Sequence, residues 1–351
     1  MRALNTNTID TGLIWNRYRN NFSRHLLGVA RYVQSSAMNT LQEECGHTSL
    51  RLGFSPYITL LSQGDRRLSE LADILGISRQ ACNQAVKQVE AAGYITRAVD
   101  PADGRARQLT LSKKGRKLSR DGERIVAQLD KQFSQLVGAQ RLADTGKSLD
   151  RLTRKLSLRI DRPRTPVQHA SMGALLPRLS DYIMRRLMVL NHAKGHPRLK
   201  LSFAQVLTLI GPQGGRIQQM AAAHDVSKQA ISAIATELEA LDYLVRQADP
   251  LDARQIVLQF TDRGQALIAD SVASVDQLQQ EFTAIIGSAA LKRMTATLCE
   301  LYRALQLERD IFDSASTVDI KLLARQLQQQ LGSDDSRTLA TLLMQRATTT
   351  R

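Results

Sequence analysis

The sequence predicts a mainly α-helical protein built from two tandem units of the same fold. The stretch "DPADGRARQLTLSKKGRKL", residues 100–118, returns as "DPLDARQIVLQFTDRGQAL" at 249–267, a shift of 149 residues. The same shift aligns the surrounding sequence without a gap, and long helical patterns flank both copies. A self-match of this length indicates a duplicated folding unit, because solenoid repeats are only about 20–50 residues long.

Each unit is expected to begin with a long helix and to continue with short ones. Apolar residues recur at spacings of three and four over residues 21–44, as on one face of a helix, and residues 172–192 repeat the pattern. Three shorter helical patterns follow, over residues 55–64, 67–76 and 78–93. Gly76 supplies a turn and Ser78 stands where an N-cap belongs, so a helix-turn-helix is predicted.

The third short helix carries the candidate base-reading face. Its inward stripe is predicted to consist of Ala81, Ala85, Val89 and Ala92. The opposite, donor-rich face is predicted to hold Arg79, Gln80, Asn83, Gln84 and Lys87. Arg, Gln and Asn suit bidentate contacts with guanine and adenine edges, and an α-helix fits the major groove.

After Tyr94 the apolar period changes from that of a helix to two. The segments "YITRAVD" and "RQLTLS" therefore read as paired strands, and the Pro and Gly of "DPADGR" mark the turn between them. This hairpin is the wing of a winged helix. Arg105 and Arg107 make its tip basic, and arginines on such a tip can enter the strongly negative minor groove.

Long helical patterns also follow the wing, from Lys113 to about residue 136 and from Gly138 to about 158. Their apolar faces are too extended for so small a module to cover, so they should pack against equivalent helices of a partner. We expect three regions: a first winged-helix unit at 1–165, a diverged second unit at 166–315, and a C-terminal helical extension at 316–351.

The chain resembles the MarR family of bacterial transcription regulators. The most specific part is the wing pattern of Asp103, Arg105 and Gly115, which returns as Asp252, Arg254 and Gly264. The resemblance implies interleaved terminal helices, a recognition helix for each half-site, wing arginines in the minor groove, and release from DNA by a small aromatic effector or an oxidised cysteine. It departs from the family in length, because ordinary members are single units of about half this size. The duplication therefore predicts an intramolecular pseudo-dimer, with a homodimer of four winged helices as the alternative.

Charge and composition support a partner that is a polyanion. The net charge is +15, and residues 1–165 hold 28 Lys and Arg against 15 Asp and Glu, a net of +13, whereas residues 166–351 hold 20 against 18, a net of +2. Aromatic residues make up only 4%, which argues against binding by base stacking. There is no apolar run of about 18 residues, and three cysteines make no disulfide framework, so we expect a cytoplasmic protein without a membrane segment.

The second copy has lost donors where DNA would be touched, so it should bind more weakly. Asn83, Gln84 and Lys87 become Ser232, Ala233 and Thr236, and Arg107 becomes Ile256. The candidate DNA contacts in the first unit are Ser78, Arg79, Gln80, Asn83, Gln84, Lys87, Arg105 and Arg107, and those in the second are Ser227, Lys228, Gln229, Ser232 and Arg254. The expected site is double-stranded and pseudo-palindromic or asymmetric, with Gln80 and Asn83 reading bases and Lys87 and Arg107 contacting phosphate.

The remaining candidates carry less specific signals. An effector cavity could be lined by Trp15, Tyr18, Phe22, His25, Tyr32 and Tyr57, with core packing as the alternative. Cys82 is predicted to be a small core residue, with redox sensing as the alternative. Cys45 beside His47 lacks the second cluster that a metal site needs, and His47, which recurs as His196, is expected to have a turn or helix-end role. No catalytic motif or cofactor-binding motif is recognisable, so no enzyme activity is expected. The competing function is a protein-interaction or sensor module whose second winged helix no longer reads DNA.

Overall fold

The structure, a computed structural model, describes residues 6–100, 103–158, 171–212, 214–223, 227–249 and 252–307. The chain divides into two compact units: unit 1 comprises Met1–Gly195 with Asp270–Leu305, and unit 2 comprises His196–Ala269 with Gln306–Arg351. The expected boundary at residue 165 and the extension at 316–351 lie outside the described residues. Within the described part of the chain, no helix is long and apolar enough to cross a membrane.

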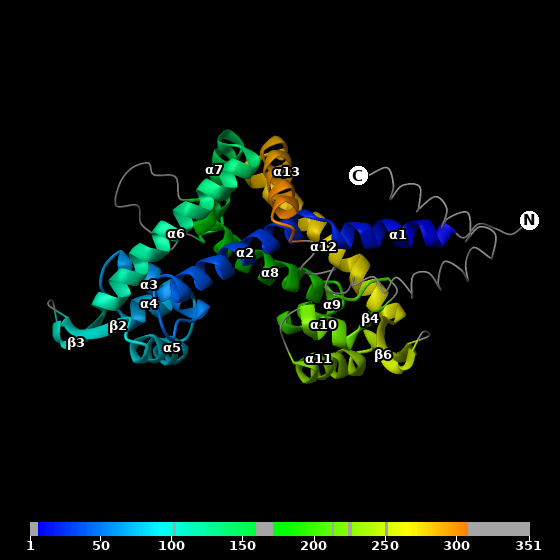
Figure 1. Ribbon diagram of the computed structural model, residues 1–351, viewed down its shortest axis with the longest axis horizontal. Helices are drawn as coiled ribbons and strands as arrows, with labels where there is room; N and C mark the ends of the chain where they lie inside the picture. The colour runs from blue at the N-terminus through cyan, green and yellow to red at the C-terminus, as the bar shows by residue number, and fades with distance from the viewer. Residues whose placement is uncertain are drawn as a thin grey trace, which may run out of the picture. The chain divides into compact units, whose positions relative to one another are not determined.

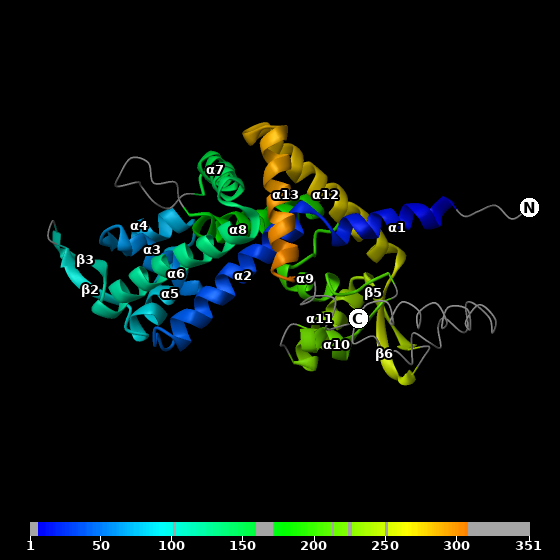
Figure 2. The same ribbon diagram turned by 45° about the horizontal axis from the view of Figure 1, so that its top comes forward.

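Unit 1 contains a helical body drawn from both halves of the chain (Figures 1 and 2). Its helices are α1 (Thr6–Arg19), α2 (Phe22–Glu43), α6 (Lys113–Val137), α7 (Ala139–Lys155), α8 (Met172–Ala193), the part of α12 (Asp262–Ile286) from Asp270 onward, and α13 (Ser288–Ala304). Helices α2 and α7 each pack against both α8 and α13. The periodicities at 21–44 and 172–192 therefore predicted real helices, α2 and α8, and their apolar faces meet one another.

The core of this body joins large side chains that are distant in sequence. Phe22 on α2 meets Phe282 on α12 edge to face, with ring centroids 5.9 Å apart, and both rings are buried. A buried polar contact accompanies them, in which the Ser274 hydroxyl donates to Asn191 Oδ1 over 3.2 Å. Because each fully buried large apolar side chain contributes about 1.5–3 kcal/mol, the early and late helices stabilise one another mainly by apolar burial.

The start of α8 is held by a residue from α6. Ser171, at the N-cap, makes no side-chain cap, and the Gly173 amide instead donates to Asp130 Oδ1 over 3.0 Å. A carboxylate also suits the partial positive charge of a helix N-terminus. A Cβ at position 173 would lie 3.0 Å from Val126 Cγ1, so glycine permits this close approach. Asp130 therefore connects α6 to the N-terminus of α8.

Unit 1 also contains the first winged helix. Its elements are α3 (Ser55–Ser62), β1 (Arg66–Arg67), α4 (Leu68–Leu75), α5 (Arg79–Ala91), β2 (Ile95–Asp100) and β3 (Asp103–Leu111). As expected, Gly76 turns the chain in a left-handed conformation, with φ of 64°, and the Ser78 hydroxyl accepts from the Ala81 amide over 3.1 Å. The strands form an antiparallel sheet in the order β1-β3-β2, in which the two-residue β1 was not predicted.

The glycine of the wing pattern has a steric role. Ser112 caps α6 by accepting from the Gly115 amide over 3.0 Å, and this places the first turn of α6 against the end of α5. A Cβ on Gly115 would lie 2.0 Å from the carbonyl oxygen of Tyr94. Gly264 stands in the same relation to Tyr243, at 2.1 Å. No other residue fits without moving the backbone.

Unit 2 repeats the order of these elements. They are η2 (Leu201–Phe203), α9 (Ala204–Leu207), β4 (Gly215–Arg216), α10 (Ile217–Ala223), α11 (Lys228–Ala240), β5 (Leu244–Asp249) and β6 (Asp252–Phe260). Its sheet has the order β4-β6-β5. The register is also the same after a shift of 149 residues, since Ile95 pairs with Leu111 and Leu244 pairs with Phe260.

The predicted inward stripe of α5 is wrong in three of its four members. The buried residues are Cys82, Val86 and Val89, whereas Ala81 is exposed and Ala85 and Ala92 are half-buried. Alanine is small enough to lie on either face of a helix, so a run of alanines does not fix which side is buried. The complete burial of Cys82 agrees with its interpretation as a small core residue.

Candidate nucleic-acid interface

The outer face of α5 is rich in hydrogen-bond donors. Arg79, Gln80, Gln84 and Lys87 are exposed, and Asn83 is half-buried. The helix is fixed by its Ser78 cap and by packing on α4 and β2, so these side chains project from a rigid element. Such a face presents long polar side chains to solvent at the spacing of one side of a helix, which is what a major groove accepts.

The wing lies beside this face. Arg107 on β3 is exposed and pairs in register with Val99 on β2, which is 60% exposed. The backbone of Arg105 belongs to β3, but its side chain lies outside the described residues, as does that of Asp103. The structure thus places one of the two predicted wing arginines beside an exposed apolar residue.

An arginine that sequence reasoning did not assign joins the wing to α5. Arg97 on β2 donates through Nε to Glu90 Oε2 over 3.0 Å and through its terminal nitrogen to Asn83 Oδ1 over 3.3 Å. Its equivalent, Arg246, also pairs with the equivalent glutamate, with a terminal guanidinium nitrogen 2.6 Å from Glu239 Oε2. The signal was present in the sequence, because both Arg97 and Glu90 recur after the shift of 149 residues.

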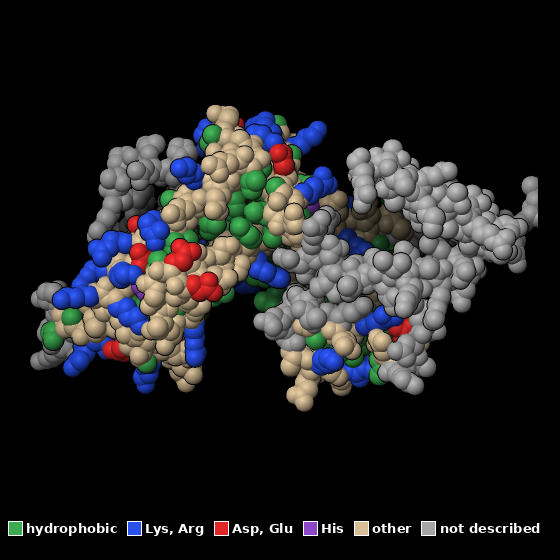
Figure 3. Space-filling model, in the orientation of Figure 1, with side chains coloured by type: hydrophobic (Ala, Val, Ile, Leu, Met, Phe, Trp, Pro, Cys, Tyr) green, Lys and Arg blue, Asp and Glu red, His purple; other side chains and the backbone are tan. Residues whose placement is uncertain are grey.

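Positive charge extends from the first winged helix onto α6. The exposed cations at the start of α6 are Lys113, Arg116, Lys117 and Arg120. In Figure 3, Lys and Arg side chains gather over the lower left of the view, where α6 begins and the wing lies. Lys114 has a structural role instead, because its ammonium donates to the Ala92 carbonyl over 2.9 Å and lies 4.3 Å from the Tyr94 ring centroid.

The corresponding face of unit 2 is built differently. Ser227, Lys228 and Gln229 are exposed at the start of α11, and Ser227 caps that helix by accepting from the Ala230 amide over 3.1 Å. Ser232 is half-buried, and its hydroxyl accepts from Arg246 over 3.3 Å. The exposed positions that follow on this face include Ala233, Thr236 and Glu237 in place of Gln84, Lys87 and Gln88.

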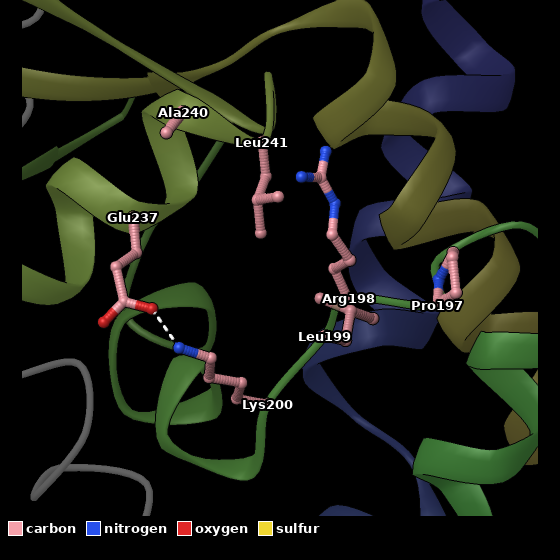
Figure 4. A pocket seen from close by; sticks show the side chains of 7 residues that line it. All are labelled: Pro197, Arg198, Leu199, Lys200, Glu237, Ala240 and Leu241. Carbon is pink, nitrogen blue, oxygen red and sulfur yellow. Dashed lines mark hydrogen bonds and ion pairs between the residues drawn. The ribbon is translucent and has the colours of Figure 1, made fainter.

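Charge on this second face is also neutralised. Glu237 on α11 forms an ion pair with Lys200, and Figure 4 shows the two side chains meeting at the edge of a groove of about 490 Å³. In the first winged helix the same place holds a hydrogen bond from the charged Arg51 guanidinium to the uncharged Gln88 amide, over 3.3 Å. On the second wing, Ile256 is 46% exposed where Arg107 stands in the first. The side chain of Arg254 lies outside the described residues.

Five of the six aromatic effector candidates have a ring contact in the structure. Trp15 contacts Tyr18, with centroids 5.8 Å apart, and Tyr32 contacts Phe133 at 6.2 Å. Phe22 packs in the core against Phe282, and Tyr57 is buried on α3.

His25 is the most unusual member of this set. It is buried, its ring centroid lies 5.0 Å from that of Tyr302, and its Nδ1 has no partner among the described residues. Burial, together with the charges of Arg303 and Arg24, lowers the pKa of His25 to about 4. The imidazole is therefore neutral at pH 7. Its neighbour Ser23 is buried too, and the Ser23 hydroxyl likewise has no partner in the described part of the chain.

Cys45 and His47 lie at the end of α2, against α6. His47 Nε2 is 2.9 Å from Asp121 Oδ2, and the Cys45 sulfur accepts from Arg124 over 3.3 Å. Hydrogen bonds from Lys117 and His47 lower the pKa of the Asp121 carboxyl. These contacts connect the end of α2 to α6, which agrees with the helix-end role expected for His47.

Comparison with known proteins gives a family match for the first winged helix. Residues 58–106 match the MarR family model. The matched segment runs from α3 through the helix-turn-helix and into β3, so it contains α5, Arg97 and Arg105. No curated protein matches the chain.

The solved structures that resemble part of this chain include several regulators. A MarR-family transcriptional regulator from Rhodococcus sp. RHA1 is 23% identical, with 39% of this chain and 96% of that one covered and a TM-score of 0.32. CouR from Rhodococcus jostii RHA1, bound to p-coumaroyl-CoA, is 24% identical, with 39% and 95% covered and a TM-score of 0.31. A transcriptional regulator from Thermotoga maritima is 20% identical, with 37% and 92% covered and a TM-score of 0.29.

Proposed function

We propose that this chain is a sequence-specific regulator of transcription that binds double-stranded DNA and acts as a MarR-type repressor. The observation that supports this most directly is the outer face of α5, where Arg79, Gln80, Gln84 and Lys87 are all exposed on a capped helix inside the MarR-family segment. In this proposal α5 enters the major groove, the wing arginine Arg105 enters the minor groove, and Arg107 contacts phosphate. No catalytic step is part of the proposal.

The two winged helices are proposed to contribute unequally. The first keeps exposed Arg and Lys side chains on its recognition helix, whereas α11 exposes Ala233, Thr236 and a paired Glu237 at the equivalent positions. The first unit therefore supplies most of the affinity, and the preferred DNA site is specified more strongly in one half than in the other. A pseudo-palindromic or asymmetric DNA site would then be contacted fully by the first unit and only partly by the second.

Selection of binding sites from random duplexes tests the function. The expected result is one enriched motif, bound with an affinity that falls steeply as salt rises, because each phosphate contact adds about 0.9 to the slope of log K against log salt. Arg105→Ala should weaken binding more than Arg254→Ala. Equal enrichment of all sequences would refute the proposed function. A larger loss of affinity in Arg254→Ala than in Arg105→Ala would refute the unequal contribution of the two units.

A single chain is proposed to supply both winged helices of a DNA clamp, meaning the pair of winged helices that binds two half-sites. Ordinary family members build this clamp from two subunits. The support is the packing of α2 and α7 from the first half against α8 and α13 from the second, which covers the apolar faces that would otherwise need a partner subunit. Joining the two readers in one chain also raises the effective concentration of the weaker one. The homodimer with four winged helices is the alternative that a mass measurement excludes or supports.

Release from DNA by a small aromatic molecule is the regulatory part of the proposal. It rests on the family resemblance and on the buried, unpartnered Nδ1 of His25 and hydroxyl of Ser23 in α2. A ligand that reaches the His25 ring would have to compete with Tyr302 on α13, whose ring centroid lies 5.0 Å away. Thermal-shift screening of aromatic acids against the full chain tests this idea, and a library without a single stabilising compound that also weakens DNA binding counts against it.

The depleted face of α11 favours a second candidate function, in which unit 2 binds a regulatory protein rather than DNA. In that case Arg254→Ala and Gln229→Ala would leave DNA binding unchanged. Footprinting distinguishes the two functions, because a DNA-binding unit 2 protects a second half-site and an interaction module does not.

A further inference from the structure

The contact between Arg97 and α5 restricts how Asn83 can meet a base. Arg97 and Glu90 are both about one-third exposed or less, with Nε 3.0 Å from Glu90 Oε2. The second branch of the guanidinium reaches Asn83 Oδ1 over 3.3 Å. We call Arg97, Glu90 and Asn83 the latch. It ties the wing to the middle of the recognition helix.

The orientation of the Asn83 amide follows from the chemistry of its partner. A guanidinium has donors and no acceptor, so only the amide oxygen can face it favourably. Turning the amide over would place its NH2 group against the Arg97 N–H groups, and both sets of donors would be left unsatisfied. The oxygen of Asn83 therefore faces Arg97, and the NH2 group is the part left for another partner.

This orientation conflicts with the usual way in which asparagine reads DNA. A bidentate contact with adenine uses both amide groups at once, since the oxygen accepts from N6 and the nitrogen donates to N7. While the latch is closed, Arg97 engages one lone pair of the Asn83 oxygen, and the NH2 group is the part of the amide turned toward a base. Guanine presents two acceptors, O6 and N7, at the major-groove edge, and thymine presents O4. Adenine also presents N7, but its N6 donor lies beside it and needs an acceptor that the turned amide offers poorly.

We propose that Arg97 is a positioning residue that holds the Asn83 amide with its NH2 group toward the base, so that the position it reads favours guanine or thymine over adenine. This inference rests on the proposed DNA-binding function and adds a base preference to it. The latch in unit 2 has the same character. Arg246 donates to the Ser232 hydroxyl over 3.3 Å and to the Thr236 hydroxyl over 3.1 Å, so the arginine again occupies acceptors on the recognition helix.

Site selection with matched variants of the full chain tests the inference. Asn83→Ala identifies the base position, because selection relaxes there and nowhere else. The wild-type chain should enrich guanine or thymine at that position. Arg97→Met keeps the aliphatic stem and releases the amide, and it should shift the preference toward adenine by about five-fold or more at this position alone. Asn83→Asp places an acceptor outward and should select cytosine.

Glu90→Gln is the control, because it weakens the ion pair but leaves the Arg97 contact with Asn83 in place. Its base preference should equal that of the wild type. Adenine selected by the wild-type chain would overturn the inference, as would an unchanged preference in Arg97→Met.

A measurement without DNA separates this inference from the proposed function. In a thermal cycle of Arg97→Met, Asn83→Ala and the double variant, the double variant should lose less melting temperature than the sum of the single variants, because the same contact is removed in each. Additive losses would mean that the latch does not exist. A chain that shows the coupling but enriches no DNA sequence would refute the proposed function and the base preference together, while an enriched motif with the wrong base would refute the inference alone.

Discussion

Acidification should destabilise the helical body through His25. The imidazole is buried between α2 and α13, its Nδ1 lacks a partner among the described residues, and Arg24 and Arg303 disfavour a proton on it. Its pKa falls from 6.5 to about 4 on folding. In this window the unfolded chain binds a proton that the folded chain does not, so stability is greatest above pH 6.5 and declines as the pH falls toward 4.

The size of the effect follows from this shift. A difference of roughly 2.5 pKa units, at 1.36 kcal/mol for each unit, corresponds to about 3 kcal/mol of unfolding free energy lost between pH 7 and pH 4. Partial hydration of the ring in the folded state would reduce this value. The loss is nevertheless a substantial fraction of the 5–15 kcal/mol that typically stabilises a domain.

Denaturant unfolding of the wild type and of His25→Gln at pH 7, 5.5 and 4 measures it. Glutamine does not titrate, so the free-energy gap between the two proteins should narrow or reverse by about 3 kcal/mol as the pH falls. Ser23→Ala is the matched control, since it alters an equally buried neighbour that carries no charge, and its gap to the wild type should stay constant. A gap for His25→Gln that does not change with pH would refute the burial of a neutral imidazole.

Three further outcomes are expected. Gly115→Ala should destabilise the first winged helix by more than about 2 kcal/mol, because the added methyl group would lie 2.0 Å from the Tyr94 carbonyl oxygen. Gly122→Ala in the same helix meets nothing within 4 Å and should stabilise the helix by about 0.5–1 kcal/mol. Chemical denaturation compares the two variants. Asp130→Ala should cost about 1 kcal/mol through loss of the α8 cap, and Asp130→Asn should retain most of that stability, so equal losses in the two variants would contradict the capping role. Light scattering at micromolar concentration should give a mass near 39.0 kDa, and twice that mass, stable on dilution, would contradict the single-chain clamp.

The parts of the fold that the sequence predicted are those with a long apolar period. The helices α2 and α8 span 22 residues each, long enough for spacings of three and four to establish themselves, and the mainly helical class is confirmed. The wing could be read because Pro and Gly mark its turn. The two-residue strand β1 carries no period at all, and it forms because Arg66 and Arg67 meet β3 in space.

The candidate site was predicted less completely, for physical reasons that differ by residue. Arg79 and Lys87 are exposed because nothing apolar on their side of the helix needs covering. Asn83 is half-buried rather than exposed on this face, and its partner, Arg97, belongs to another element. A contact between two elements leaves no signal in the local sequence pattern of either one. Alanine-rich stretches gave the wrong inward stripe, since burial in α5 follows the larger side chains of Cys82, Val86 and Val89.

The packing of α2 against α13 also constrains how the protein is made. About 260 residues separate the end of α2 at Glu43 from the end of α13 at Ala304, and translation at about 5–20 residues per second needs tens of seconds to cover them. During that interval α2 is part of a nascent chain in which α13, one of the helices that pack against it, has not yet been synthesised. The first winged helix can form on the ribosome early, whereas the body waits for the last helix to emerge. A chaperone that shields exposed helices during synthesis would therefore matter more for this chain than for two separately made halves.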